Sequence, residues 1–249
     1  MSAALVAALA GVAFAAFATE AMLGFAGTVL AVSLGAQLVP LDLLLPAFVP
    51  INLALSLSIA VADRARILWR QLAVELAPPV GVGAAFGLVL FRLPWRLHLQ
   101  LCFGLFVVAL AGLELWRMRR PAAAPSRWTG RALLCAGGLA HGLFGAGGPM
   151  IVYVLRQRLA DKAAFRATLA VAWLTLNSLL VANYAAMQLY RRELAAPMIA
   201  MAAVVAPAFV AGNRLHRAIE PALFHRVVVL LLVAAGALLA VRTAIALAA

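Results

Sequence analysis

The chain has 249 residues, of which 67% are hydrophobic and only 11% are charged. Soluble globular chains carry about 25% charged residues, so this composition excludes an ordinary soluble domain and indicates a polytopic membrane protein. The formal net charge of +12 comes mainly from arginines in short clusters between apolar runs, which favours cytoplasmic loops and contact with anionic lipids over nucleic-acid binding.

Eight apolar runs are each about as long as the roughly 20 residues that a helix needs to cross a bilayer. They predict an all-α, polytopic integral membrane protein with about eight transmembrane helices. The runs cover residues 8–38, 41–62, 71–91, 98–116, 132–155, 164–187, 197–213 and 222–245. The N-terminus lacks the basic region of a cleaved leader, so we expect the first run to be a retained transmembrane helix.

The first run is too long for one straight crossing, because at about 1.5 Å per residue it would reach roughly 46 Å. We predict a break at Gly24-Phe-Ala-Gly-Thr28, where freed backbone groups can bind substrate. Gly24, Gly27 and Thr28 are therefore candidate substrate-binding residues. Glu20 lies one turn before the break, and an ionisable residue inside a span is costly enough to suggest a function. We predict that Glu20 takes part in proton coupling.

The second run carries uncharged polar residues between apolar ones. Asn52 and Ser56 are four residues apart and so share a helix face. Pro46 and Pro50 are expected to kink this helix and to free carbonyl groups beside them. Asn52 is a candidate for substrate contact, with hydrogen bonding between helices as the alternative.

The fifth run contains Gly142-Leu-Phe-Gly-Ala-Gly-Gly-Pro-Met150, which is a poor sequence for a continuous membrane helix. Pro149 suits the first position of a new helix, where its missing N–H group would have no partner anyway. We therefore predict a break near Gly147-Gly148, followed by a half-helix whose positive N-terminus can hold an anion. Gly145, Gly147 and Gly148 are candidate substrate-binding residues, with close helix packing as the alternative.

The two halves of the chain resemble each other in the order of these features. Offsets of 121 and then 125 residues give the pairs Glu20–His141, Gly24–Gly145, Gly27–Gly148, Asn52–Asn177 and Gly87–Gly212. His141 becomes a second proton-coupling candidate, because histidine titrates near neutral pH, and Asn177 a second substrate-binding amide. The predicted domains are a first transmembrane repeat over residues 1–120, a basic linker over 121–131 and a second repeat over 132–249. Whether the repeats are inverted or parallel stays open.

The block Gly142-Leu-Phe-Gly-Ala-Gly-Gly-Pro149, the following Arg166-Ala-Thr168 and the two-half layout resemble the sulfite exporter TauE/SafE family of bacterial membrane permeases. The resemblance implies a multi-pass protein of the bacterial inner membrane that moves sulfite, sulfonates or related sulfur-containing anions. The first half has two glycines where the second has three and a proline, so the halves are not expected to bind substrate equally.

We expect a secondary transporter for small anions that works by alternating access of two repeats. The sequence contains no ATP-binding loop, metal-ligand cluster, Ser/His/Asp arrangement or nucleotide-cofactor fingerprint, so we expect no enzyme activity, metal or cofactor. The expected partners are the anion, membrane lipids and protons as the coupling ion, with a homo-oligomer left open and nucleic acid excluded. The alternatives are transport of another small solute, such as an amino acid, and a non-transport role as a membrane assembly factor.

Overall fold

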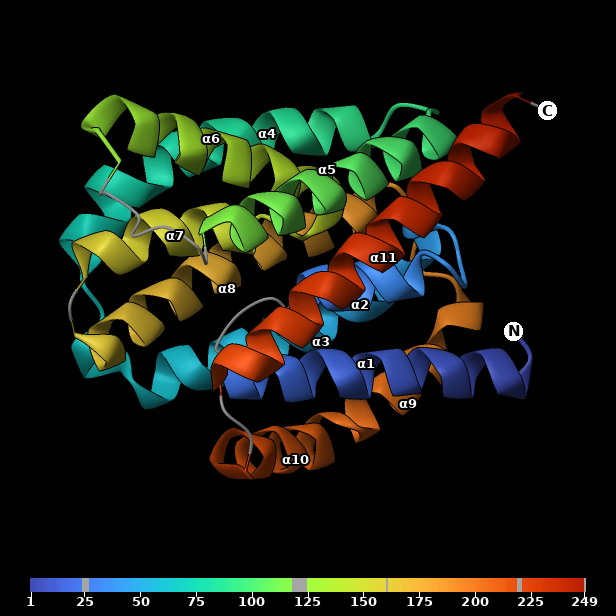
Figure 1. Cartoon of the computed structure of the whole chain (residues 1–249), viewed down its shortest axis with the longest axis horizontal. Helices are drawn as coiled ribbons and strands as arrows, with labels where there is room; N and C mark the ends of the chain where they lie inside the picture. Colours follow the sequence, from blue (N-terminus) through green and yellow to red (C-terminus); the bar gives the residue numbers. More distant parts are fainter. Residues whose placement is uncertain (24–26, 118–124, 160, 219–220, 249) are drawn as a thin grey trace. The chain divides into compact units, whose positions relative to one another are not determined.

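The computed structural model describes residues 1–23, 27–117, 125–159, 161–218 and 221–248 (Figure 1). Eleven α-helices lie in these ranges: α1 (Ala3–Leu23), α2 (Gly27–Gly35), α3 (Leu41–Ala62), α4 (Ala77–Phe91), α5 (Arg96–Arg117), α6 (Arg127–Phe144), α7 (Gly148–Arg158), α8 (Lys162–Ala186), α9 (Ala195–Ala203), α10 (Val205–Ala218) and α11 (Pro221–Ala248). Short 3-10 helices cover η1 (Arg64–Arg66) and η3 (Arg192–Leu194), and a π-helix, η2 (Gln71–Leu76), leads into α4.

Among the described residues, seven helical stretches are long and apolar enough to cross a membrane. They are Ala3–Ala21, Leu41–Ala62, Gln71–Phe91, Leu97–Trp116, Ala163–Ala186, Arg192–Gly212 and Arg226–Ala248. Each corresponds to one of the predicted runs, and the remaining run, residues 132–155, is divided between α6 and α7. The prediction of an all-α, multi-pass membrane protein is confirmed.

The chain forms two compact units that do not coincide with its two sequence halves. The first unit comprises Met1–Leu45, Pro94–Ala123 and Arg191–Ala249, and the second comprises Pro46–Leu93 and Ala124–Tyr190. In the first unit, α1 packs against α2, α9 and α10, and α5 packs against α11. In the second unit, α4 packs along α6, and α6 also contacts α7 and α8. Each unit therefore combines helices from both halves of the chain.

The predicted linker, residues 121–131, is only partly a linker in the structure. Its residues 121–124 lie outside the described residues. Helix α6 begins at Arg127, and the hydroxyl of Ser126 accepts a hydrogen bond from the Thr129 N–H at 3.2 Å. A serine at this position stabilises a helix start because it satisfies an N–H group that has no partner within the helix. The capping serine therefore moves the start of the second half's first helix into the predicted linker.

Glycines on both helices allow α4 and α6 to pack in close contact. A β-carbon on Gly87 of α4 would lie 2.5 Å from the carbonyl oxygen of Leu139, and one on Gly142 of α6 would lie 2.5 Å from that of Ala84. Contacts this short do not occur for real side chains, so neither position accepts a larger residue. Small residues spaced four apart are typical of helix pairs inside membranes. For Gly142, the structure thus supports helix packing.

The same kind of contact recurs in the first unit at positions that the sequence offsets relate. Gly212 of α10 packs against the carbonyl oxygen of Ala18 in α1, as Gly87 of α4 packs against that of Leu139 in α6. The offset of 125 residues relates the two glycines, and the offset of 121 relates the two carbonyl groups. These equivalent contacts support an internal duplication in which α4 and α10 each pack on the first helix of the opposite half.

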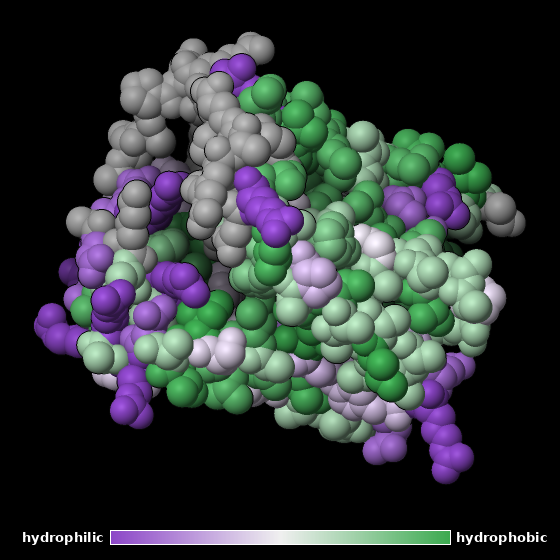
Figure 2. Space-filling view, turned by 90° about the horizontal axis from the view of Figure 1, so that it is seen from below, coloured by the Kyte–Doolittle hydropathy of each residue, from purple (hydrophilic) through white to green (hydrophobic). Residues whose placement is uncertain are grey.

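The surface of the protein is largely apolar, as a lipid environment requires. Figure 2 shows hydrophobic residues over much of the face that it draws. On α4, the large side chains that remain exposed are Val82, Phe86, Val89 and Leu90, which follow a helical spacing. Helix α4 therefore presents a glycine face to α6 and an apolar face for lipid.

Candidate functional site

The predicted break in the fifth run is present between α6 and α7. Helix α6 ends at Phe144, and Gly145 follows in the left-handed conformation, with φ 64° and ψ 10°. The Gly145 N–H donates to the carbonyl oxygen of His141 at 2.7 Å, which is a common way for a helix to end. Gly145 is thus required to terminate α6, and its N–H group is used within the protein.

Helix α7 begins at Gly148, with Pro149 in its first turn and Gly147 before it. Gly147 has no side chain that could cap the helix, and Pro149 has no N–H group. The N–H groups of Gly148 and Met150 belong to the first turn, where helix geometry gives them no partner within the helix. The N-terminus of α7 is therefore positive and carries donors for an anion.

The two adjacent glycines at this helix start differ in how much room they have. A β-carbon on Gly147 would overlap the carbonyl oxygen of Gly137 in α6 and lie 2.8 Å from the β-carbon of His141. A β-carbon on Gly148 would meet only the ring of Trp173, at 3.8 and 3.9 Å, which is ordinary van der Waals contact. Gly147 therefore serves packing, whereas Gly148 has room for a β-carbon.

Three side chains from α6 and α8 meet beside this helix start. His141 Nε2 lies 3.1 Å from Asn177 Oδ1, and the imidazole stacks on the Trp173 ring with centroids 5.5 Å apart and planes 8° apart. Trp173 and Asn177 are four residues apart and so share one face of α8. The exposed fractions are only 3% for His141 and 1% for Asn177. The sequence offset identified His141 and Asn177 separately, and the fold brings them into contact.

Two polar atoms of this group are buried without a partner. His141 Nδ1 and Asn177 Nδ2 make no hydrogen bond in the structure. Leaving a buried donor or acceptor unsatisfied costs about 1–3 kcal/mol, so an unpaired group in a native protein calls for a ligand or water. We refer to Gly148, His141, Trp173 and Asn177, together with the first turn of α7, as the α7 site. It combines a positive helix end, an amide, an imidazole and a glycine that has room for a β-carbon.

The break in the first half carries a carboxylate in place of the histidine. Gly27 begins α2, and a β-carbon there would lie 2.6 Å from both the carbonyl oxygen of Ala16 and Oε2 of Glu20. Glu20 Oε2 is itself buried without a hydrogen-bond partner. A carboxylate beside a helix N-terminus occupies the place that the helix dipole favours for an anion. The two breaks therefore differ in the ionisable side chain that lies beside the helix start, a carboxylate in the first half and an imidazole in the second.

The contacts also adjust the register of the repeat by one residue. Gly27 and Gly147 both pack against a backbone carbonyl and the β-carbon of the ionisable residue on the preceding helix. By these contacts the counterpart of Gly27 is Gly147, although the sequence offset pairs it with Gly148. Gly148 then corresponds to Thr28, which is half-buried on α2. The position that is open in the second half thus holds a threonine in the first.

The other predicted site residues do not belong to the α7 site. Gly24 lies outside the described residues. Asn52 is buried on α3, and its carbonyl oxygen accepts the Ser56 hydroxyl at 2.8 Å. Glu20, Gly27 and Thr28 belong to the first compact unit, whereas Asn52 belongs to the second, as does the α7 site. The structure therefore brings four of the ten predicted site residues together at one helix start: His141, Gly147, Gly148 and Asn177.

Comparison with known proteins places this architecture in a family. The sequence model of the family described as "Sulfite exporter TauE/SafE" matches residues 9–239. The chain belongs to the TauE/SafE family. It is also 31% identical over 173 residues to "Probable inner membrane transporter protein TsaS" of Comamonas testosteroni, an alignment that covers 69% of this chain and 72% of that protein. No solved structure matches the chain. This TauE/SafE protein is a membrane transporter.

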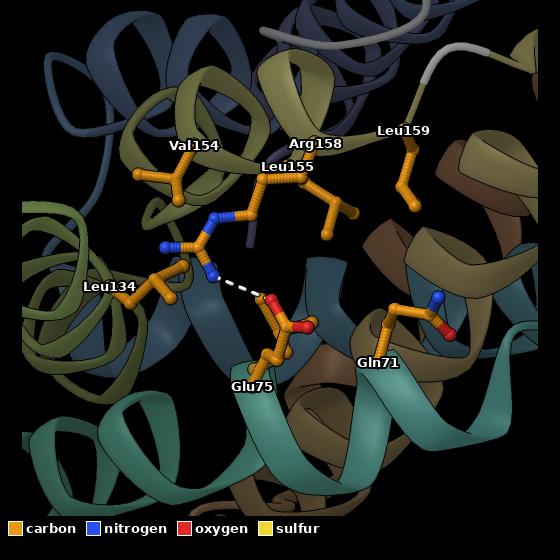
Figure 3. A pocket seen from close by; sticks show the side chains of 8 residues that line it. Gln71, Glu75, Leu134, Val154, Leu155, Arg158 and Leu159 are labelled. Atoms are coloured by element: carbon orange, nitrogen blue, oxygen red, sulfur yellow. Dashed lines mark hydrogen bonds and ion pairs between the residues drawn. The ribbon is translucent and has the colours of Figure 1, made fainter. Parts of the chain in front are cut away.

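A surface hollow in this TauE/SafE transporter is distinct from the α7 site. It lies between η2 and the end of α7, with leucine and valine side chains around the ion pair of Arg158 and Glu75 (Figure 3). Arg158 Nη1 lies 2.8 Å from Glu75 Oε2, and the two side chains are 30% and 46% exposed. Exposed pairs of this kind contribute little to stability. We interpret the hollow as a surface feature in which the ion pair of Arg158 and Glu75 links the C-terminal end of α7 to η2.

Sequence reasoning left two residues of the TauE/SafE site unresolved. A tryptophan in the middle of an apolar run, such as Trp173, can line a cavity or simply pack, and the structure places its ring against both His141 and Gly148. Gly137 was not singled out, yet it is the residue against which Gly147 packs. A signal was present, because Gly137 stands four residues before His141 and so shares its helix face. The described residues contain no group of three metal-ligating side chains.

Proposed function

We propose that this protein is a secondary transporter of small sulfur-containing oxyanions, sulfite or organosulfonates, and that the anion binds at the α7 site. The observation that carries the proposal is an uncapped helix start beside two buried, unpartnered polar atoms, His141 Nδ1 and Asn177 Nδ2. Half-helix N-termini recur as anion contacts in secondary transporters. The family description and the printed name of the relative support an anion and the inner membrane.

The site offers an oxyanion several N–H donors and one apolar wall. The N–H groups of Gly148 and Met150 and the amide N–H groups of Asn177 can each donate to an oxygen atom. A hydrogen bond to a charged group contributes about 1.5–3 kcal/mol, so two or three suffice for binding in the micromolar to millimolar range after ordering costs. The Trp173 ring supplies an apolar wall beside the open position at Gly148. An organic group attached to a sulfonate would contact this wall.

Residues of the first half have a different part in the proposal. Glu20 is the proton-coupling residue of that half, and Gly24, Gly27, Thr28 and Asn52 contribute to the substrate path. Each compact unit contains helices of both halves, fixed by contacts such as that of α4 with α6. In this proposal, alternating access is a movement of one compact unit relative to the other, and not of one sequence half relative to the other.

The test is anion flux in proteoliposomes that contain the purified protein. The panel comprises sulfite, methanesulfonate, taurine, sulfate and alanine. Sulfite or a sulfonate should be transported, with sulfate and alanine clearly slower. Flux of alanine alone would assign the protein to another substrate class, and no flux with any solute would favour a non-transport role.

A matched pair of variants ties the flux to the site. Asn177→Asp keeps the side-chain shape but places a carboxylate against the anion, so flux should fall at least about tenfold through charge repulsion. Asn183→Asp, on the same helix, faces Arg92, whose Nε donates to Asn183 Oδ1 at 2.7 Å, and it should retain flux. Equal flux in the two variants would remove the α7 site from the proposal.

A further inference from the structure

We infer that the α7 site binds one proton with each anion, because the His141–Asn177 pair can satisfy an unprotonated oxyanion only after the histidine has gained a proton. The inference rests on the proposed anion site and names its coupling ion and stoichiometry. It follows from counting hydrogen-bond donors and acceptors at two buried side chains whose contact the structure gives, His141 Nε2 to Asn177 Oδ1 at 3.1 Å.

A neutral pair offers the ligand two N–H donors and one acceptor atom that has no partner. Neutral imidazole has one N–H group and one lone pair, and an asparagine amide has one oxygen and one NH₂ group. With Nε2–H donating to Oδ1, the atoms left over are the Nδ1 lone pair and the amide NH₂ of Asn177. With the amide turned, one amide hydrogen would be donated to Nε2, leaving Nδ1–H, the second amide hydrogen and the amide oxygen. Both arrangements present one acceptor to the ligand.

An unprotonated sulfonate or sulfite oxygen cannot satisfy that acceptor, because it has only lone pairs itself. Adding a proton to His141 removes the mismatch: Nε2–H donates to Asn177 Oδ1, and Nδ1–H and the amide NH₂ both donate to the anion. A protonated oxyanion, such as hydrogen sulfite, brings its own O–H group and matches the neutral pair. In each case one proton enters the site with each anion, and for a monovalent sulfonate the two charges balance.

The surroundings of His141 leave the anion as the counter-ion. Helix α6 packs against α4, α7 and α8, and none of these four helices contains an Asp or Glu over its described length. The titratable side chains on the three packing helices are Tyr153, Arg156, Arg158, Lys162, Arg166 and Tyr184. Arg158 pairs with Glu75 and Arg166 with Asp63, both away from His141. A buried imidazolium without a carboxylate is unfavourable, so the proton is expected to arrive with the ligand.

The direct test measures protons taken up when the purified protein binds methanesulfonate, an anion that holds no proton near neutral pH. In weakly buffered detergent solution, a pH indicator should record about one proton taken up for each anion bound. His141→Gln keeps an amide that can bond Asn177 but cannot hold the proton, so its uptake should vanish and its affinity should fall at least about tenfold. His98→Gln, at an exposed histidine in the first turn of α5, should behave as the wild type.

The flux assay separates failure of this inference from failure of the proposed function. In proteoliposomes with an internal pH indicator, methanesulfonate entry should acidify the interior one-for-one and create no net current. Wild-type flux or binding without proton movement would overturn the inference and leave the anion transporter in place. Absence of both binding and flux for every sulfur anion would overturn the proposed function, and the inference with it. Full proton uptake in His141→Gln would show that another group carries the proton.

Discussion

Adjacent glycines at the start of α7 should respond in opposite ways to an added side chain. In Gly147→Ala the new methyl group would overlap the carbonyl oxygen of Gly137 and lie 2.8 Å from His141 Cβ. The overlap is with backbone, which cannot turn aside, so α7 must shift away from α6. Forcing extra atoms into a packed interior typically costs 1–3 kcal/mol. We expect Gly147→Ala to lower the thermal stability of the protein and its yield.

Gly148→Val should leave stability nearly unchanged and remove transport. A β-carbon at Gly148 meets only Trp173, at 3.8 and 3.9 Å, which is ordinary contact and requires no shift of the backbone. The valine would fill the space beside the N–H groups that the anion needs. Losing one hydrogen bond to a charged group removes about 1.5–3 kcal/mol, which is roughly a ten- to 150-fold loss of affinity. Gly148→Ala, with one methyl group, should show a smaller loss.

The assay combines thermal denaturation of the purified variants with flux of sulfite and methanesulfonate in proteoliposomes. The informative result is the contrast, with Gly147→Ala defective in stability and Gly148→Val defective in flux at wild-type stability. Wild-type flux in Gly148→Val would refute the reasoning, because it would show that no anion passes the N-terminus of α7. Wild-type stability in Gly147→Ala would contradict the assigned packing against α6.

Three further outcomes follow from the contacts. Trp173→Ala should raise the KM for anion flux up to roughly tenfold, because stacked aromatic pairs contribute about 0.5–1.5 kcal/mol, whereas Trp173→Phe should stay closer to wild type. Glu75→Gln should change stability by less than about 1 kcal/mol and leave flux intact, since its ion pair with Arg158 is exposed; a large loss of flux would place substrate at that hollow. Glu20→Gln should weaken the response of flux to an imposed pH gradient in vesicles, and an unaltered response would assign Glu20 a structural role only.

The class of the protein and the position of its breaks were readable from the sequence because both depend on local chemistry. The length of an apolar run decides whether a helix can cross a bilayer, whatever packs beside it. Glycine and proline act on their own backbone, so the run Gly145 to Pro149 predicted the end of α6 and the start of α7. The internal duplication stays a prediction, and the equivalent contacts of Gly87 and Gly212 agree with it.

The role of each individual glycine was decided only by the tertiary structure. Gly142, Gly145, Gly147 and Gly148 look alike in the sequence. Gly142 packs on α4, Gly145 ends α6, Gly147 packs on α6, and Gly148 has room for a β-carbon beside Trp173. The difference is set by what lies across from each α-carbon, and that atom comes from a distant segment or another helix turn. No local pattern contains that information.

The contact of His141 with Asn177 also belongs to the fold and not to the pattern. The two residues lie on different helices, α6 and α8, and α7 separates them in the chain. Sequence symmetry marked each as a candidate but gave no reason for them to touch. The same holds for the compact units, which join helices from both halves because glycine faces such as that of α4 fit a helix of the opposite half. Local chemistry determines where helices begin and end, whereas the fit of their side chains determines which of them meet.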